Sequence, residues 1–309
     1  FTYANRVAVG DMIGPIIFTT GPGIFNNSPV NNLEDAKRIV QKYSDYYRVN
    51  TVKQYLSGNR RHRQLLNMAI QDAQLIPTTE GMDMKLMVTQ IMDGYSLEHT
   101  LPHYPLYKDM IELIVQSGTY YDPTVIVGTG PRAEYYYWTR TDVHGNKKLN
   151  HFFPHDILDL QTRRVPWFHE SEFSYKEYAK TFKNIVNAGG KIGVGSHGEM
   201  QGICYHWELW NIQSGGMSEM DALRCATIIG SEAIGFSNDL GSIEEGKLAD
   251  LILLTKNPLD DIRNTNSIKY VMKNGILYDA DSLDEVWPTI KKLPPQYWHG
   301  KTPKHHDKY

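Results

Sequence analysis

Four polar side chains stand near the ends of short apolar segments, where the strands of an α/β protein would turn into loops. They are Lys53 in TVKQY, Glu80 in PTTEG, His99 in SLEHT and His197 in GVGSHG. The carboxyl ends of parallel strands meet at one face, which is where barrel enzymes place their active sites. Because such strands are apolar, a charged group there needs a partner or a metal. The pattern predicts one polar pocket able to bind a metal ion.

Each of these residues also has a simpler interpretation. A single lysine near a strand end is more often solvated, and a single histidine is more often hydrogen-bonded than bound to a metal. Neighbouring strand residues point to opposite faces. Glu98 and His99 are therefore not both expected to face the interior, nor are Thr79 and Glu80. We expect His99 and Glu80 to face inward.

Short apolar segments alternate with longer helical ones, which indicates βα units and a parallel sheet. Asn32 and Ser218 are predicted helix N-caps, and Gly118 ends a helix. Six strand–helix units fit most of an α/β (β/α)8 TIM-type barrel whose N-terminal strands are missing. The predicted strands are 15–21, 50–58, 75–81, 95–100, 119–128 and 191–198, and the helices are 32–47, 61–74, 82–93, 106–118, 171–190 and 218–229.

The pattern divides the chain into three parts. Residues 1–235 are predicted to form the partial barrel, about strands 3–8, interrupted by an aromatic-rich insertion at 129–170. Residues 236–285 contain two β segments without a long helix and are predicted to belong to a small β-sandwich. Residues 286–309 are predicted to be an extended tail. We expect the chain to be a fragment, completed by the missing N-terminal part of the same protein or by a neighbouring chain.

The composition narrows the classes of partner. The chain has 309 residues, of which 41% are hydrophobic and 22% charged, with a net charge of −3. This is an ordinary globular composition, with no electrostatic case for nucleic acid or an anionic membrane. No segment approaches the ~20 apolar residues of a membrane-spanning helix. The expected partner is a small-molecule substrate, a homo-oligomer is compatible with the sequence, and nothing specifies the cellular location.

Several segments resemble the second half of amidohydrolase-superfamily enzymes, nearest to the imidazolonepropionase and Xaa-Pro-dipeptidase-like group. They are SLEHT after IMDGY, then GGKIGVGSHG, and finally SEAIGFSNDLGSIEEGKLADLILLTKNPL. The last is the most specific, because there the family's chain returns from the barrel to a β-sandwich. The resemblance implies one or two divalent metal ions, usually zinc, that activate a water to attack a C–N, ester or related bond.

The resemblance also implies a set of metal ligands. The family uses an His-x-His on strand 1, in some members a carboxylated lysine on strand 4, a histidine on each of strands 5 and 6, and an aspartate on strand 8. Lys53 matches the lysine, which is a ligand only as a carbamate, and His99 matches the strand-6 histidine. The chain starts after strand 1. Glu80 or Thr79 replaces the strand-5 histidine, and His197 replaces the aspartate.

These replacements keep some capacity for metal binding. Glu80 can bind a cation through oxygen, and His197 can bind the metal or act as the catalytic base. Glu199 and His206 follow in the segment EMQGICYHWELW and are predicted to contact substrate. The alternative is that this polar and aromatic segment packs over the barrel mouth.

The sequence favours a metal-dependent hydrolase of an amide, cyclic amide or dipeptide-like C–N bond. An alternative is an amidohydrolase fold that binds a ligand without catalysis or with altered chemistry, because two family ligands are replaced. A glycoside hydrolase using Glu80 and Glu199 is a third option. The GKLADLILL segment speaks against it.

Overall fold

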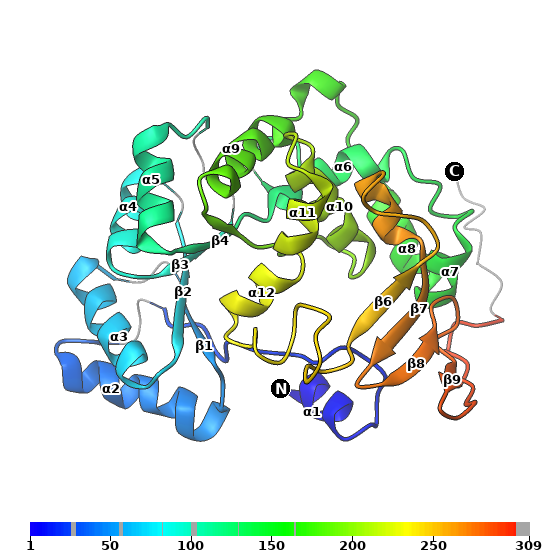
Figure 1. Cartoon of the computed structure of the whole chain (residues 1–309), viewed down its shortest axis with the longest axis horizontal. Coiled ribbons are helices and arrows are strands. Elements are labelled where there is room, and N and C mark those ends of the chain that lie inside the picture. Colours follow the sequence, from blue (N-terminus) through cyan, green and yellow to red (C-terminus); the bar gives the residue numbers. More distant parts are fainter. Residues whose placement is uncertain are drawn as a thin grey trace.

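The computed structural model describes residues 1–25, 29–55, 58–81, 83–99, 104–128, 130–163 and 165–300. Five parallel strands form its main sheet in the order of the chain, with helices on either side (Figure 1). This arrangement confirms the α/β class with a parallel sheet. The strands are β1 (Thr51–Gln54), β2 (Ile76–Glu80), β3 (Ser96–Glu98), β4 (Tyr120–Asp122) and β5 (Lys191–Ile192).

The strand predicted over 15–21 is wrong. No strand forms there, and the chain makes only an isolated parallel bridge between Ile24 and Gln54. The N–H of Ile24 donates to the carbonyl of Lys53, and the N–H of Tyr55 donates to the carbonyl of Ile24. Pro22 lacks an N–H, so pairing does not extend backwards along the segment.

Helices fill the intervals between the first strands, as the sequence predicts. Asn32 caps α2 by accepting from the N–H of Asp35, and Gly118 ends α5 in the left-handed conformation. Both predicted signals are confirmed. The elements up to β4 are α1 (Thr2–Ala8), α2 (Leu33–Lys42), the π-helix η1 (Tyr43–Tyr47), α3 (Arg60–Asp72), α4 (Met84–Met92) and α5 (Lys108–Ser117).

The predicted insertion is a series of short helices between β4 and the long helix that precedes β5. Its inner side chains, among them Trp138, Leu149 and Leu158, pack with Met200 and Trp207 in one hydrophobic cluster. The insertion is therefore joined to the segment after β5. The elements between β4 and β5 are η2 (Val125–Val127), α6 (Ala133–Trp138), α7 (Lys147–Phe152), α8 (His155–Thr162), η3 (Glu170–Glu172) and α9 (Tyr175–Asn187).

After β5 the chain forms three helices and then a second sheet on the side of the molecule away from α2–α5 (Figure 1). Ser218 caps α11 as predicted. The second sheet is antiparallel with the order β6-β7-β8-β9, and β9 occupies the start of the predicted tail. Residues 301–309 lie outside the described residues. The elements are α10 (Ile203–Gln213), α11 (Glu219–Cys225), α12 (Ile228–Ala233), β6 (Leu251–Leu254), η4 (Ile262–Asn266), β7 (Ile268–Lys273), β8 (Ile276–Asp279) and β9 (Glu285–Trp287).

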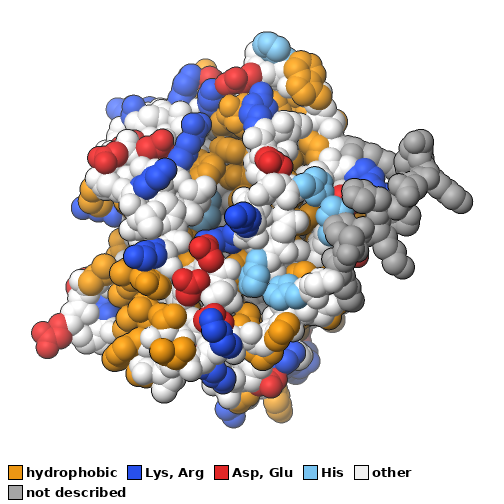
Figure 2. Space-filling model, turned by 90° about the vertical axis from the view of Figure 1, so that its right-hand side faces the viewer, with side chains coloured by type: hydrophobic (Ala, Val, Ile, Leu, Met, Phe, Trp, Pro, Cys, Tyr) orange, Lys and Arg blue, Asp and Glu red, His pale blue; other side chains and the backbone are white. Residues whose placement is uncertain are grey.

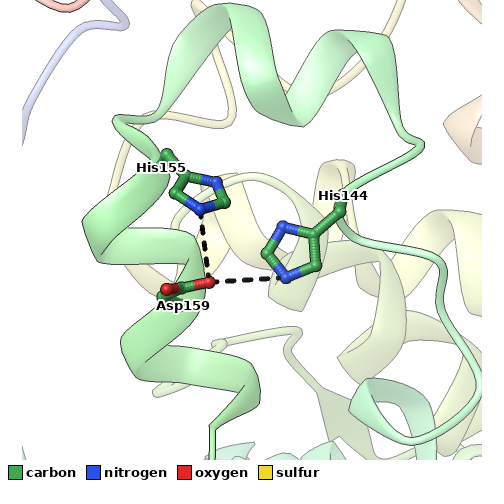
Figure 3. A group of neighbouring side chains, drawn as sticks. All are labelled: His144, His155 and Asp159. Carbon is green, nitrogen blue, oxygen red and sulfur yellow. Dashed lines mark ion pairs between the residues drawn. The ribbon is translucent and has the colours of Figure 1, made fainter. Parts of the chain in front are cut away.

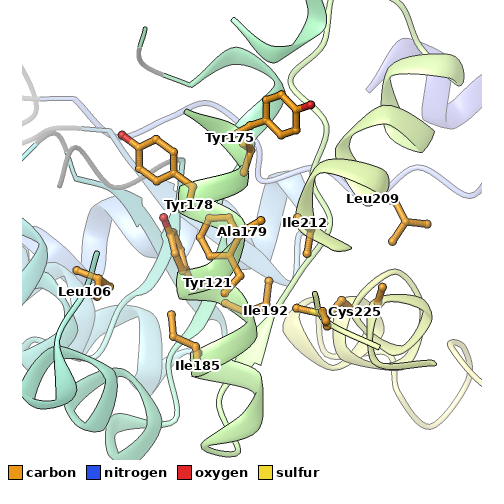
Figure 4. Packing of buried hydrophobic residues seen from close by; sticks show 14 of the residues in the cluster. Leu106, Tyr121, Tyr175, Tyr178, Ala179, Ile185, Ile192, Leu209, Ile212 and Cys225 are labelled. Carbon is orange, nitrogen blue, oxygen red and sulfur yellow. The ribbon is translucent and has the colours of Figure 1, made fainter. Parts of the chain in front are cut away.

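Helix α9 packs against the sheet through a continuous apolar face. Tyr178, Ala179 and Ile185 point toward Tyr121 of β4 and Ile192 of β5 (Figure 4). Tyr175, Tyr178, Phe182 and Ile185 follow one another at spacings of three, four and three residues, which places their side chains on one face of the helix. This packing fixes β4 and β5, and with them the loops that follow each strand.

Charged side chains of both signs are interspersed on the face drawn in Figure 2, together with several histidines. This mixture agrees with the near balance of 32 basic and 35 acidic residues in the sequence. Within the described residues, no helix has the length and apolar character needed to cross a membrane.

Candidate active site

Three carboxylates lie in one row at the carboxyl ends of neighbouring strands. The parallel register pairs Glu80 with Glu98 and Glu98 with Asp122. Nζ of Lys53 lies 2.6 Å from Oε2 of Glu98 and 3.5 Å from Oε2 of Glu80. Oε1 of Glu98 also accepts from the hydroxyl of Thr78 at 2.8 Å. Because these charges are largely shielded from water, the ion pairs are what make their burial tolerable.

Two carboxylates against one ammonium leave this cluster with a net negative charge. Burial lowers the pKa of Lys53, but hydrogen bonding and attraction from Glu98 and then Glu80 outweigh burial, so its pKa is raised and the ammonium persists. Nζ of Lys53 lies closer to Glu98 than to Glu80, so the negative charge of Glu80, beside His99, is the less compensated of the two. A site with this charge attracts a cation.

His99 faces the same cluster. Its Nε2 lies 2.8 Å from Oε2 of Glu80, and its Nδ1 lies 3.1 Å from Oγ1 of Thr124. Burial, followed by the nearby Lys53 charge, lowers the pKa of His99. The neutral imidazole therefore prevails at neutral pH, and a neutral ring is the form that binds a metal.

The prediction that only one of Glu98 and His99 faces the site is wrong. β3 ends at Glu98, and His99 adopts a φ of 74°. The left-handed residue reverses the alternation of the strand, so both side chains reach the cluster. Thr79, by contrast, donates to the carbonyl of Gln54 on the neighbouring strand.

His197 lies beside His99 on the loop after β5. The two ring centroids are 5.5 Å apart, at an interplanar angle of 56°. His197 is exposed and lines a pocket of about 520 Å³ together with the following loop and Tyr205 of α10. The imidazole therefore stands between the buried cluster and a cavity open to solvent.

Asp122 completes the row and is half-buried. Burial, then the charge of Glu98, raises the pKa of Asp122 to about 7, although a backbone hydrogen bond from Gly195 opposes the shift. Oδ1 of Asp122 has no hydrogen-bond partner among the described residues. A Cβ at Gly195 would overlap this carboxyl, so only glycine lets the loop after β5 pass so closely. Asp122 can thus hold a proton at neutral pH.

A buried glutamate on α10 fixes the turn that carries Thr124. The carboxylate of Glu208 accepts from the N–H of Val125 at 2.6 Å and from the N–H of Ile126 at 2.7 Å. Complete burial raises the pKa of Glu208 to about 8, against the lowering effect of these two hydrogen bonds. Thr124, in the left-handed region at φ 45°, holds the His99 ring. Glu208 therefore positions His99 through the backbone of one turn.

The structure brings four of the sequence-predicted site residues together, places Glu199 on the rim of the pocket that His197 lines, and leaves His206 apart. Lys53, Glu80 and His99 form one chain of contacts, with His197 beside it. Glu199 lies on the exposed rim, where its Oε1 is 3.1 Å from Nη1 of Arg132. His206 points away, with its Nδ1 3.2 Å from Oγ1 of Thr265 in η4. The catalytic and binding roles of all these residues stay predictions.

Three residues of the site have roles that sequence reasoning missed. Strict strand alternation predicts that Glu98 faces away from the site when His99 faces it. Asp122 lies inside the strand predicted over 119–128, but β4 ends at this residue, and its contact with the loop after β5 depends on the approach of Gly195. Glu208 lies in the segment read as a loop and helix over the barrel mouth, and its carboxylate instead faces inward. In the sequence, the one sign of this role is that Glu208 is an acidic residue within a helical segment rich in aromatic residues.

The comparisons with known proteins define the class. The sequence profile of the Amidohydrolase family matches residues 88–277, more than half of the chain, and the chain therefore belongs to the amidohydrolase family. This confirms the predicted resemblance. Membership suggests hydrolysis of a C–N bond, and the family is typically metal-dependent. His99, Asp122 and His197 lie in the matched segment, whereas Lys53 and Glu80 precede it.

The individual proteins that the chain is similar to share less than a third of their residues with it over the aligned parts. Ochratoxinase of Aspergillus niger is 29% identical over 110 residues, which cover 34% of this chain and 23% of that protein. A Xaa-Pro dipeptidase solved with methionine in its active site has a TM-score of 0.64 and 22% identity, over 90% of this chain and 71% of that chain. Molinate hydrolase has a TM-score of 0.65 and 17% identity, over 91% and 70%. At these identities, the solved structures show the fold, which is of the TIM-barrel type.

Proposed function

We propose that the chain carries the active site of a divalent-metal-dependent hydrolase that cleaves an amide, cyclic amide or dipeptide-like C–N bond of a small molecule. One observation carries the proposal: Oε2 of Glu80 and Nε2 of His99 meet at 2.8 Å at the strand ends, with the His197 ring beside them. Family membership supports the class of reaction. The names of the relatives, a dipeptidase, ochratoxinase and molinate hydrolase, support a small organic substrate.

The chemistry of these donors suits a zinc-like ion, although among the described residues the donor atoms of Glu80, His99 and His197 do not all lie within 4.8 Å of one another, so the exposed His197 side chain would have to turn toward the other two. Glu80, His99 and His197 would supply one carboxylate oxygen and two imidazole nitrogens, a combination that zinc accepts. The net negative charge of the cluster favours a cation at this point. A bound zinc ion lowers the pKa of a water and polarises a carbonyl group. Three protein ligands would leave room for a water or substrate atom on the ion.

Thr124 prepares His99 for this role. A neutral imidazole carries one proton, and its hydroxyl partner can donate or accept. When Nε2 donates to Glu80, Nδ1 accepts from Thr124. When Nε2 binds a metal, Nδ1–H donates to the same hydroxyl oxygen, which needs only a rotation of the threonine hydroxyl. Such partners orient the ring and raise its affinity for the ion.

Thr124→Val should therefore weaken zinc binding by about 10- to 100-fold while preserving the β-branched shape. Equilibrium dialysis of the refolded chain with zinc measures the effect. Thr265→Val is the matched control, because Thr265 contacts His206 in the same way at 3.2 Å. Equal zinc affinity in the two variants would contradict the role of Thr124.

Lys53 is better suited to balance charge than to bind the metal. A carbamate would place a third negative group beside Glu98 and Glu80, whose attraction raises the pKa of Lys53 and retains the ammonium. Carbamate formation needs the neutral amine. A mass measurement under native conditions, with and without bicarbonate, distinguishes the two forms by the added carboxyl group.

Asp122 should make stability depend on pH. The pKa of Asp122 in the folded protein, about 7, lies above the ordinary value near 4. Its contribution to the free energy of unfolding is therefore complete below pH 4 and is lost as pH rises through 7. Asp122→Asn removes this titration. Between pH 5 and pH 8 the stability difference should shift in favour of the variant by about 2 kcal/mol. Urea unfolding with a chelator present measures it, and a constant difference would refute the raised pKa.

The proposed function is tested with zinc-loaded and chelated protein on Xaa-Pro dipeptides, N-acyl amino acids and cyclic amides. Hydrolysis should need the metal and should be lost in the double variant His99→Ala/His197→Ala. Turnover that survives in the double variant would exclude this site. A protein that binds zinc there without hydrolysing any C–N substrate would favour the ligand-binding alternative, which the two replaced family ligands support.

A further inference from the structure

A second group of metal-binding side chains lies in the insertion between β4 and α9. His155 and Asp159 stand one turn apart on α8 and share a face, and His144 approaches them from the loop before α7 (Figure 3). Among the described residues, this is where three histidine, cysteine or acidic side chains come close enough to hold one ion. None of them takes part in the cluster at the strand ends.

The three donor atoms have nearly the spacing that a bound ion requires. Nε2 of His144 lies 3.5 Å from Oδ1 of Asp159, and Nε2 of His155 lies 3.6 Å from the same oxygen. All donors lie within 4.8 Å of one another, and the two rings are 5.1 Å apart between centroids. Zinc–ligand bonds of about 2.0–2.1 Å in a tetrahedron separate donors by about 3.3 Å. Small side-chain rotations therefore suffice.

The carboxylate is already oriented for such a role. Nη2 of Arg163 contacts Oδ2 of Asp159 at 2.9 Å, which leaves Oδ1 facing the two imidazoles. A metal ligand held through its other oxygen is a common arrangement around protein-bound metals. The His144 side chain is about half exposed, so an ion can arrive from solvent. The fourth position would be filled by water.

We propose that His144, His155 and Asp159 bind a divalent first-row transition metal ion, with zinc as the fitting example. Two imidazole nitrogens and one carboxylate oxygen suit such ions better than calcium or magnesium, which prefer oxygen. The ion joins the loop at 143–146 to α8. Val143 and Leu158, next to the ligands, are buried in the cluster that includes Met200 and Trp207. The ion would therefore hold together two parts of the insertion whose neighbouring apolar side chains pack against the segment after β5.

Zinc stoichiometry of the whole chain tests the site. The measurements use a His99→Asn background, which weakens the proposed ion at the strand ends. The His99→Asn protein, called the parent below, should bind one zinc ion per chain. The same protein with His144→Gln and His155→Gln added should bind none. His169→Gln, an exposed histidine on the same insertion, is the matched control and should bind like the parent. Equal stoichiometry with and without the two ligands would overturn the proposal.

Hydrogen exchange locates the ion independently of stoichiometry. Zinc should slow exchange of the α8 amides, and of those at 144–146, at least several-fold in the parent and leave them unchanged in the double variant. All the changed side chains are partly or fully exposed, so the variants are expected to fold. Protection confined to residues outside 143–162 would likewise overturn the proposal. Failure here leaves the hydrolase proposal intact, since the strand-end site shares no residue with this one.

Discussion

Replacing His99 by alanine is expected to lower kcat/KM by roughly 10³-fold. The metal's stabilisation of charge in the transition state is worth several kcal/mol, and about 4 kcal/mol corresponds to 10³-fold in rate. His99 is the donor that the structure holds most firmly, between Oε2 of Glu80 and Oγ1 of Thr124. Its loss should also remove zinc from the strand-end site. Steady-state kinetics on a cleaved C–N substrate and metal analysis measure the two effects together.

Two further variants separate the ligand from the backbone. His99 has a φ of 74°, a conformation that asparagine tolerates better than alanine. His99→Asn should therefore lose activity like the alanine variant while unfolding at nearly the wild-type denaturant concentration. His206→Gln is the matched control, because His206 also has one threonine contact but faces η4. An equal fall in activity in the His206 variant would contradict a specific role for His99, and the unfolding midpoint of that variant would tell lost structure from the predicted substrate contact of His206.

Local patterns in the sequence predicted most of the elements that carry the site. Apolar runs marked β1 to β5, and Asn32, Ser218 and Gly118 marked helix ends through contacts within a few residues. Such signals are complete in the local sequence. The segment 15–21 shows their limit, because an apolar run becomes a strand only where a partner strand lies beside it.

The composition of the site could be predicted only in part. Lys53, Glu80, His99 and His197 follow strands, and parallel strands end at one edge, so their proximity follows from topology. Glu98 and His99 both reach the site because β3 ends at Glu98 and because His99 has a positive φ. The approach of His144 to α8 depends on the packing of the insertion. These features arise from tertiary contacts that no single segment contains.

Glu208→Ala is expected to lower the free energy of unfolding by about 3–5 kcal/mol. The carboxyl group is fully buried, and its oxygens are the acceptors for the N–H groups of both Val125 and Ile126. Its removal leaves two buried donors without a partner, each costing about 1–3 kcal/mol, and a cavity in their place. Urea unfolding at pH 7 measures the change. Glu199→Ala, whose exposed carboxylate pairs with Arg132, should change stability by less than about 1 kcal/mol.

Glu208→Gln separates the hydrogen bonds from the packing. The amide keeps the shape and one acceptor, so it should lose only about 1–2 kcal/mol. If Glu208 positions His99 through Thr124, the glutamine variant should also bind zinc at the strand ends more weakly at a temperature where it is fully folded. The turn that carries Thr124 would then be less fixed, and the His99 ring would lose a fixed hydrogen-bond partner. Unchanged zinc affinity, together with the predicted loss of stability, would confine Glu208 to holding the fold.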